Sequence, residues 1–459
     1  MWCKLLIGIR YLYRIFSSNM KRSLRISLLI LLTTILFLFA PKPAGNQYCG
    51  TYFRINKMMG FLINCDSHQY ILLSMHPSKL LSKDSVARRQ NRPLYIALTY
   101  VIGKPIEYVL FAVYNGNENV HLKLDKLLNS TKLLKRLELS SFEKQDKYTT
   151  AANNSTLILQ MIAFYVAYLL LNFLVLLLSV YLFEVMLEQF QIQQKIIHLL
   201  SIVLIANTIV KDAIYSAHEQ MFLFLTPISI VYVLHHYLYK KQNRKIYGLT
   251  FLFGLGCLTY GSFVLYLPAL WLLLFYQDKT IKTIYANRMI YVIHAFLFLL
   301  PTIAWIVACK QISGQYYNHE VVNFRELVWM IDALKIGVVE FIKTFIFNLL
   351  HFLLIFLKAV FPFLLVYFIL WNINRPFENS GKYATLFTVL ISCFIVFNAF
   401  FALLGYYAYR LSFSSSVLVL IGIAAQFQLL LENKPLRTNY YYKRLSAALI
   451  LWCILVFIL

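Results

Sequence analysis

Long runs of apolar residues dominate this chain, and short polar segments separate them. After a first run at 26–40, further runs lie near 157–183, 196–210, 220–239, 247–259, 262–276, 288–309, 346–372, 384–404, 414–432 and 445–459. About 20 apolar residues in a helix cross roughly 30 Å of hydrocarbon. The pattern therefore predicts an all-α, polytopic transmembrane helical bundle of about 11 spans.

The stretch 247–276 permits two interpretations. As a single helix it would be about 45 Å long, which exceeds the thickness of a bilayer, and three glycines and Pro268 give it places to bend. If it crosses twice, four basic segments fall on the side of the N-terminus, namely 240–245, 279–288, 375–382 and 434–444. We therefore predict two short helices, and a re-entrant pair would serve equally.

The longest stretch without a convincing span is 41–156, which we predict to be an extracytoplasmic loop. Within it, residues 94–114 are interrupted by glycine, proline and charges, which predicts an amphipathic helix lying at the interface. Cys49 and Cys65 share this loop as one disulfide or as two free thiols. The remaining predicted parts are a cytoplasmic basic N-terminus (1–25), a first span (26–40), transmembrane helices (157–309), a second extracytoplasmic loop (310–345) and C-terminal transmembrane helices (346–459).

Composition agrees with a membrane environment. The 459 residues are 60% hydrophobic and 14% charged, and the mean hydropathy is +0.66. The 43 Lys and Arg against 19 Asp and Glu raise the question of a nucleic-acid partner. Most of this excess lies between the apolar runs, where the positive-inside rule and anionic lipid place it, so we predict membrane lipids and no nucleic acid as partners.

The charge pattern also predicts an orientation. Residues 1–25 carry basic residues and no acidic one, so the N-terminus is predicted to stay in the cytoplasm. Abundant Lys, Asn, Ile and Tyr are typical of an AT-rich bacterial genome. The predicted location is therefore the bacterial inner (plasma) membrane, as a multi-pass protein.

Two stretches of the first outer loop carry the most informative residues. CDSHQYILLS at 65–74 places Asp66 soon after the first span and Tyr70 four residues on, and RQNRPLYIAL at 89–98 opens the amphipathic helix with Arg-Pro-Leu-Tyr. A third stretch, YGLTFLFGLGCLTY at 247–260, is rich in glycine. Over residues 1 to about 280, these motifs and the topology resemble the GT-C superfamily of membrane glycosyltransferases.

The resemblance implies a polyprenyl-phosphate-sugar donor and an essential Asp or Glu in the first outer loop. Tyr260 occupies the position where many members carry Arg. Inverting transfer of a sugar needs a base that accepts the proton of the acceptor hydroxyl while phosphate leaves the anomeric carbon. Asp66 is the predicted base, and the alternative is an Asp that caps a helix beginning near Gln69.

Cationic side chains are expected around the leaving polyprenyl phosphate. Arg92 and Arg410 are the predicted phosphate ligands, because Arg410 ends a tyrosine-rich outer loop between two spans. The alternative is that both anchor the chain at the membrane interface. His68, Tyr70 and Tyr260 are the predicted substrate contacts beside them.

The short loop 211–219 contributes four more predicted substrate-binding residues. Ionisable groups at membrane depth are functional candidates by default, although a fully wet loop would remove that reason. Asp212 or Glu219 would assist Asp66 or hold a divalent cation, and His218 would orient either carboxylate. No recognised spacing of metal ligands is present, so a divalent cation is an alternative and no cofactor is predicted. The four residues are Lys211, Asp212, His218 and Glu219.

No serine-hydrolase elbow, phosphate-binding loop or dinucleotide fingerprint is present in the sequence. The predicted function is transfer of a sugar from a polyprenyl-phosphate donor to a glycan, lipid or protein acceptor on the non-cytoplasmic face, with 315–320 as an acceptor-side surface. One alternative is an O-antigen-type polysaccharide polymerase. The other is a transporter or lipid flippase, which predicts mid-span charges and an internal repeat; Lys358 is the clearest such charge, and no repeat is evident.

Overall fold

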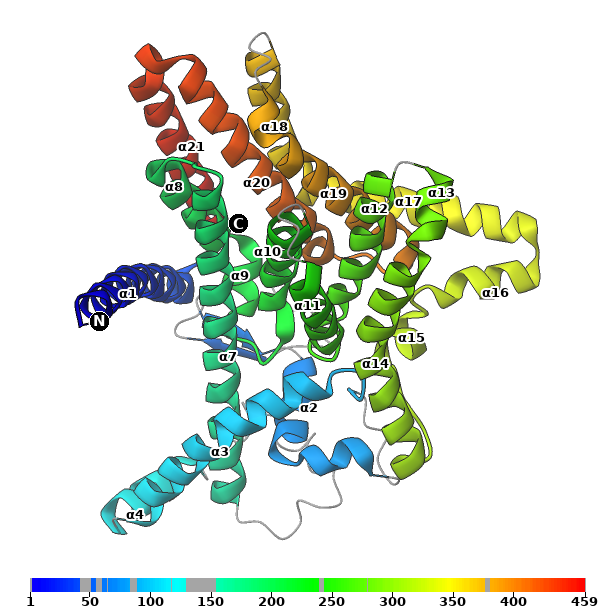
Figure 1. Cartoon of the computed structure of the whole chain (residues 1–459). Coiled ribbons are helices and arrows are strands. Elements are labelled where there is room, and N and C mark those ends of the chain that lie inside the picture. Colours follow the sequence, from blue (N-terminus) through cyan, green and yellow to red (C-terminus); the bar gives the residue numbers. More distant parts are fainter. Residues whose placement is uncertain are drawn as a thin grey trace.

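The structure, a computed structural model, describes residues 2–41, 51–54, 60–63, 65–82, 89–116, 118–128, 154–238, 243–278, 280–375 and 380–458. Within these ranges nearly all regular structure is helical (Figure 1), as predicted. The exception is a two-stranded antiparallel hairpin of β1 (Thr51–Arg54) and β2 (Gly60–Ile63), which the apolar pattern did not predict. Cys49 lies outside the described residues.

Eight of the described helices are long and apolar enough to cross a membrane, so the chain is an integral membrane protein. They are α1 (Trp2–Phe39), α3 (Pro93–Asn115), α7 (Asn154–Gln189), α14 (Arg288–Ser313), α17 (Val338–Ala359), α19 (Ala384–Leu404), α20 (Tyr409–Asn433) and α21 (Thr438–Ile458). Three shorter apolar helices join them: α8 (Gln194–Ile205), α11 (Asn243–Gly256) and α18 (Phe361–Asn374). The eight long helices include α3, which was predicted to lie at the interface.

The doubtful stretch 247–276 forms two helices, as predicted. α11 ends at Gly256, a 3-10 turn η4 (Gly261–Leu265) follows, and α12 (Tyr266–Asp278) returns. A Cβ at Gly254 would lie 2.2 Å from the carbonyl oxygen of Phe298, so this glycine lets α11 and α14 approach closely.

Two other predicted spans are wrong as single helices. Residues 196–210 divide into α8 and the short α9 (Thr208–Ala213), because Asn207 leaves helical geometry and its side chain accepts a hydrogen bond from the Val210 amide at 3.0 Å. Residues 346–372 divide at Val360, where α17 ends, since Pro362 in the first turn of α18 has no N–H for a continuous helix.

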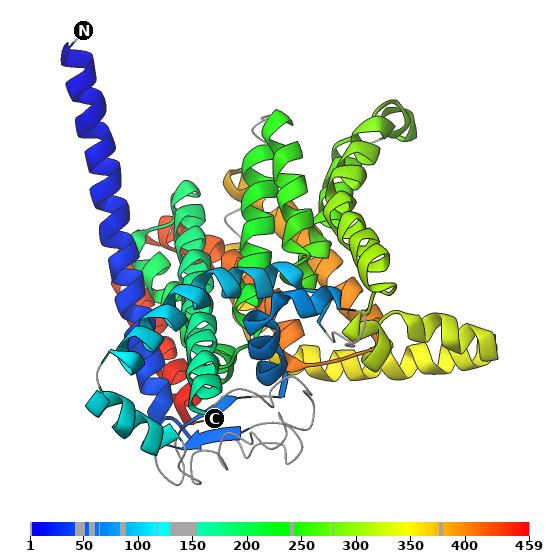
Figure 2. The same ribbon diagram turned by 90° about the horizontal axis from the view of Figure 1, so that it is seen from below.

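The predicted outer loop 310–345 is largely helical. It contains α15 (His319–Phe324) and α16 (Val328–Ile336), and α17 follows directly. α16 and α17 run side by side (Figure 1), and in Figure 2 they lie across the direction of α1. The remaining elements are α2 (Cys65–Met75), η1 (Pro77–Leu81), α4 (Glu118–Leu128), η2 (Glu219–Met221), α10 (Phe222–Val233), η3 (Leu234–Leu238), α13 (Ile281–Ala286), η6 (Ser380–Tyr383) and η7 (Pro435–Arg437).

α20 is the central helix of the bundle. All residues in its most apolar window are buried, and it packs against α10, α17, α18 and α19. Consecutive serines at 414–416 open this helix, and small residues let helices pack closely in a membrane. The Ser416 hydroxyl donates to the carbonyl oxygen of Ala359 at 2.7 Å, which ties α20 to the end of α17.

The two ends of the molecule differ. In Figure 2 the N-terminus lies at one end, and the β1–β2 hairpin lies at the other. α2, α15 and the α16–α17 pair all lie well away from the N-terminus in that view. The charged cavity described next is formed by α2, α15 and their neighbours.

Candidate functional site

Segments far apart in the sequence meet around one cavity of about 430 Å³. They come from α2, the loop before α3, the loop before α10, the turn after α11, the α15–α16 connection and the start of α20. Six of the ten residues predicted for the site line this cavity: Asp66, Arg92, His218, Glu219, Tyr260 and Arg410. The cavity is further lined by Arg89, Gln220, Glu320, Phe324, Glu326, Tyr406 and Leu411, most of which the sequence analysis missed.

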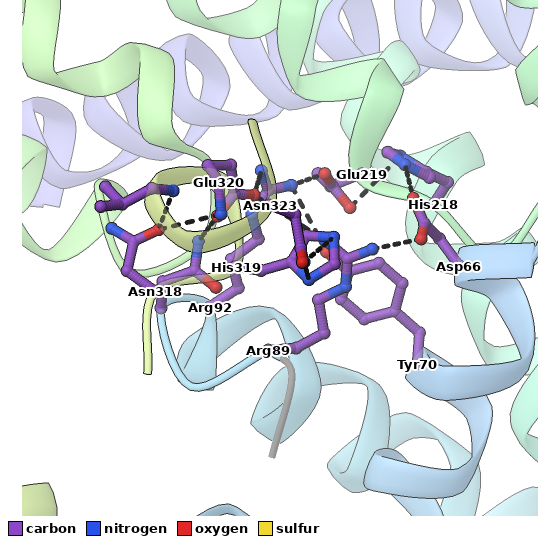
Figure 3. A network of polar contacts seen from close by, with 12 residues as sticks. Asp66, Tyr70, Arg89, Arg92, His218, Glu219, Asn318, His319, Glu320 and Asn323 are labelled. Atoms are coloured by element: carbon purple, nitrogen blue, oxygen red, sulfur yellow. Dashed lines mark hydrogen bonds and ion pairs between the residues drawn. The ribbon is translucent and has the colours of Figure 1, made fainter. Parts of the chain in front are cut away.

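Asp66 lies in the first turn of α2, where a helix dipole stabilises a negative charge. The alternative of a cap on a helix beginning near Gln69 is wrong, because α2 already begins at Cys65. Its carboxylate pairs with the guanidinium of Arg89 and lies 3.2 Å from Nε2 of His218 (Figure 3). Both partners come from other segments of the chain.

These partners determine the ionisation of Asp66. Burial by itself would raise its pKa, but the hydrogen bond to His218 and the charge of Arg89 outweigh burial and hold the pKa well below its usual range. Asp66 is therefore an ionised carboxylate at neutral pH.

Gln90 fixes the two arginines of the segment before α3. Its side chain donates to the carbonyl oxygen of Leu80 and accepts from the Tyr317 amide, both at 2.7 Å. Its own carbonyl oxygen accepts from Nε1 of Trp305 at 2.6 Å. With the side chain and the backbone of Gln90 held by these three hydrogen bonds, the flanking Arg89 and Arg92 have a defined position in the cavity.

Arg92 is surrounded by acceptors. It pairs with Glu219 and, at 2.5 Å, with Glu320, and its guanidinium lies 5.9 Å from the centroid of the Tyr260 ring. Glu320 also lies 3.7 Å from Arg89. Burial opposes ionisation of Glu320, but Arg92 and Arg89 outweigh it and lower the pKa of that carboxyl.

These five residues, Asp66, Arg89, Arg92, Glu219 and Glu320, are called the paired group below, since each forms an ion pair with another member.

His218 connects the paired group to a neutral amide. It is buried, and its Nδ1 lies 2.7 Å from Nε2 of Gln220. Burial lowers its pKa to about 4, and the charges of Arg410 and Arg92 act in the same direction, against the opposing effect of Asp66. At neutral pH the ring is uncharged. Because the Gln220 amide nitrogen donates to Nδ1, the one ring proton is on Nε2 and is donated to Asp66.

Tyr70 and His68 are not among the residues that line the cavity. Tyr70 is fully buried one helical turn after Asp66, with the guanidinium of Arg89 5.1 Å from its ring centroid and its hydroxyl accepting from Arg92 at 3.4 Å. Tyr70 therefore contacts both arginines and helps to hold them in place. His68 is half-buried on α2.

Lys211 and Asp212 also lie outside the main cavity. The Lys211 ammonium donates to the carbonyl oxygens of Val456 at 3.1 Å and Phe457 at 3.3 Å, at the C-terminal end of α21, where a cation is favoured. Asp212 lines a neighbouring cavity of about 300 Å³, which shares Gln220 and Arg410 with the first.

Arg410 and Glu326 differ from the paired group. Among the described residues, neither side chain forms an ion pair or a hydrogen bond, although both line the cavity. They are called the unpaired group below. Burial and the charge of Glu320 raise the pKa of Glu326 to about 7, against the opposing charges of Arg92 and Arg410.

Glu326 has an unusual backbone on both sides. Arg325 and Leu327 have φ of 54° and 59°, the left-handed conformation that non-glycine residues rarely adopt. Such conformations cost about 1–3 kcal/mol each and persist where the surrounding structure imposes them. No periodicity or motif in the sequence marks Glu326, so sequence reasoning had no signal for it.

The cavity is lined by groups of both charges. Four carboxyl groups and three guanidinium groups line it, although a positive lining was expected. Among the described residues, no group of three or more His, Cys, Asp or Glu is arranged to hold a metal ion.

Fold and site together define a multi-spanning integral membrane protein with a charged cavity well away from the N-terminus. No protein-family model matches the chain, and no curated protein or solved structure matches it.

Proposed function

We propose that this protein is a membrane glycosyltransferase that moves a sugar from a polyprenyl-phosphate donor to an acceptor on the non-cytoplasmic face, with inversion. The observation that carries the proposal is the single cavity in which an ionised Asp66 and an unpaired Arg410 meet. The reaction needs a carboxylate for the acceptor proton and a cation for the departing phosphate. A donor that is itself a membrane lipid suits a helical bundle of this kind.

In this proposal Asp66 is the base. His218 and Arg89 hold its carboxylate in position, and a position fixed by two partners favours attack by an oriented hydroxyl. The sugar acceptor approaches from the side of 315–320, whose Glu320 belongs to the paired group.

The proposal also divides the work of the two predicted phosphate ligands. Arg92 already pairs with two carboxylates, which leaves Arg410, within the part of the chain that the structure describes, as the cavity guanidinium with free donors. Arg410 therefore binds the phosphate, and Arg92 positions Glu219 and Glu320 around it.

The test uses the full chain in proteoliposomes with a panel of radiolabelled sugars on short-chain polyprenyl phosphates. Asp66→Asn and Asp66→Ala are expected to lower transfer by ~10²–10⁴-fold, because neither side chain accepts the proton. Glu340→Gln on α17 is the matched control, since its carboxyl is exposed and is not part of the cavity lining. Full transfer by both Asp66 variants would reject the base and with it the proposal.

The product of the same assay separates the related functions. A transferase adds one sugar to each acceptor, whereas an O-antigen-type polymerase makes a ladder of lengths. A transporter or flippase moves the lipid across the bilayer and forms no new glycosidic bond.

A further inference from the structure

The segment around Glu326 is attached to the end of α19 and to the loop that leads into α20. The Leu327 amide donates to the carbonyl oxygen of Leu404 at 3.0 Å, and Nε1 of Trp329 donates to that of Leu403 at 2.9 Å. The rings of Phe324 and Tyr406 pack with centroids 4.5 Å apart. These contacts hold the α15–α16 connection beside the loop that carries Arg410.

Gly405 makes this attachment possible. It has φ of 81°, and a Cβ there would lie 2.3 Å from Cδ1 of Trp329. Trp329 therefore packs directly on the backbone that leads to Arg410. Together with the left-handed Arg325 and Leu327, this packing fixes where the Glu326 carboxyl enters the cavity.

The groups that face Glu326 come from four elements. Glu320 belongs to α15, Arg92 precedes α3, Tyr260 follows α11, and Arg410 begins α20. Burial and Glu320 raise the pKa of Glu326 to about 7, whereas the pKa of Asp66 in the same cavity lies well below its usual range. Two carboxyl groups whose pKa values are moved apart are the arrangement that separates an acid from a base.

We propose that Glu326, in its neutral form, donates a proton to the phosphate that departs with the polyprenyl chain while Arg410 binds that phosphate. This inference rests on the proposed function. The neutral form is the one that suits an anionic substrate, because an ionised Glu326 would repel phosphate and the other two arginines are already paired.

Atoms and electrons are conserved in the proposed transfer step. The acceptor oxygen forms a bond to the anomeric carbon, and its proton passes to the Asp66 carboxylate. The bond from the anomeric carbon to the phosphate oxygen breaks, its electron pair stays on that oxygen, and the phosphate receives the proton of Glu326. Afterwards Asp66 releases its proton to water and Glu326 takes one up, which restores the starting state.

Binding of farnesyl phosphate to the purified full chain, measured by calorimetry from pH 6 to pH 8.5, tests the neutral form. The affinity of the wild type relative to that of Glu326→Gln is expected to fall as Glu326 ionises, by up to roughly tenfold per pH unit above its pKa. The amide of Glu326→Gln donates a hydrogen bond at every pH. Glu340→Gln is expected to follow the wild type throughout.

Transfer kinetics test the proton itself. Glu326→Gln is expected to lose ~10²-fold in kcat with little change in KM for the donor, because an amide binds phosphate but has no proton to transfer. A wild-type to Glu326→Gln affinity ratio that stays constant with pH, or full kcat in Glu326→Gln, would overturn this inference alone. Absence of farnesyl phosphate binding by the wild type at every pH would instead overturn the proposed function.

Discussion

The paired group and the unpaired group line the same cavity but differ in what surrounds their charges. Each member of the paired group has an opposite charge within 4 Å, and Arg89 and Glu219 are almost completely buried. Arg410 and Glu326 have no such partner among the described residues. The comparison indicates that the first group builds the cavity, with Asp66 also the proposed base, and that the second group is available to bind a substrate.

A buried ion pair that loses one partner leaves an uncompensated charge, and this cost is larger than the benefit of the intact pair. Substitutions in the paired group should therefore act first on stability. Substitutions in the unpaired group should act on binding and transfer. The next three predictions concern the paired group, its neighbour His218 and the outlying Lys211, and the expected effect decreases in that order.

Arg92→Ala is expected to lower the free energy of unfolding by about 3–5 kcal/mol, because the buried Glu219 is left without its cation and Glu320 keeps only Arg89. Thermal unfolding in detergent measures the loss. Arg410→Ala is the matched arginine and should change stability by less than about 0.5 kcal/mol. Equal losses in the two variants would contradict the division into two groups.

His218, which contacts Asp66 of the paired group, gives a pH-dependent test of stability. Its pKa is about 4 in the folded protein and about 6.5 when unfolded, so the unfolded chain binds more protons between these values and stability falls as the pH drops from 6.5 toward 4. Asp66, whose pKa is lowered, adds a loss of the same sign at lower pH. Glu326 acts in the opposite direction between pH 4.5 and 7, because its raised pKa makes the folded state bind more protons.

His218→Gln should therefore lose less stability than the wild type when the pH is lowered from 7 to 5. The difference between the two losses is on the order of 2 kcal/mol. Glu326→Gln serves as the comparison and should steepen the acid loss, because it removes the opposing contribution. The measurement is the melting temperature of all three proteins across this range. A His218→Gln variant with the wild-type pH slope would show that the ring is not buried in its neutral form.

Lys211→Met is expected to have the smallest effect. The methionine keeps the apolar stem but loses the two hydrogen bonds to the end of α21, which contribute about 1–2 kcal/mol to stability. Transfer should be unchanged, since Lys211 is not part of the cavity lining. A large loss of transfer with unchanged stability would place Lys211 in the site, as the sequence analysis predicted.

Helix positions were predicted well where one apolar run makes one helix. The predicted run 384–404 is α19 residue for residue, and the division of 247–276 into α11 and α12 followed from charge distribution. The prediction was wrong at 346–372, where hydropathy stays high through a proline that ends one helix and begins another. Hydropathy reports which solvent a residue prefers, and it carries no information on where hydrogen bonding is interrupted.

The membership of the cavity was partly predictable. Asp66 was singled out by the resemblance to the GT-C superfamily, Arg410 by the need for a cation at the phosphate, and His218 because ionisable groups at membrane depth are functional candidates. Their roles stay predictions. Lys211 is also an ionisable residue beside an apolar run, yet its ammonium binds the end of α21. The sequence pattern therefore identifies candidate residues but not which of them lie together in the cavity.

That this chain resides in a membrane follows from its sequence, because 60% hydrophobic residues in long runs leave no other solvent for its helices. Which charges neutralise one another, and which stay unpaired among the described residues, follows from the three-dimensional fold. Arg89 meets Asp66, and Glu326 lies near Arg410, through contacts between segments that are distant in the chain. Pairing depends on distances of a few ångströms that no linear pattern encodes, and for Glu326 it depends on two left-handed residues that no propensity favours.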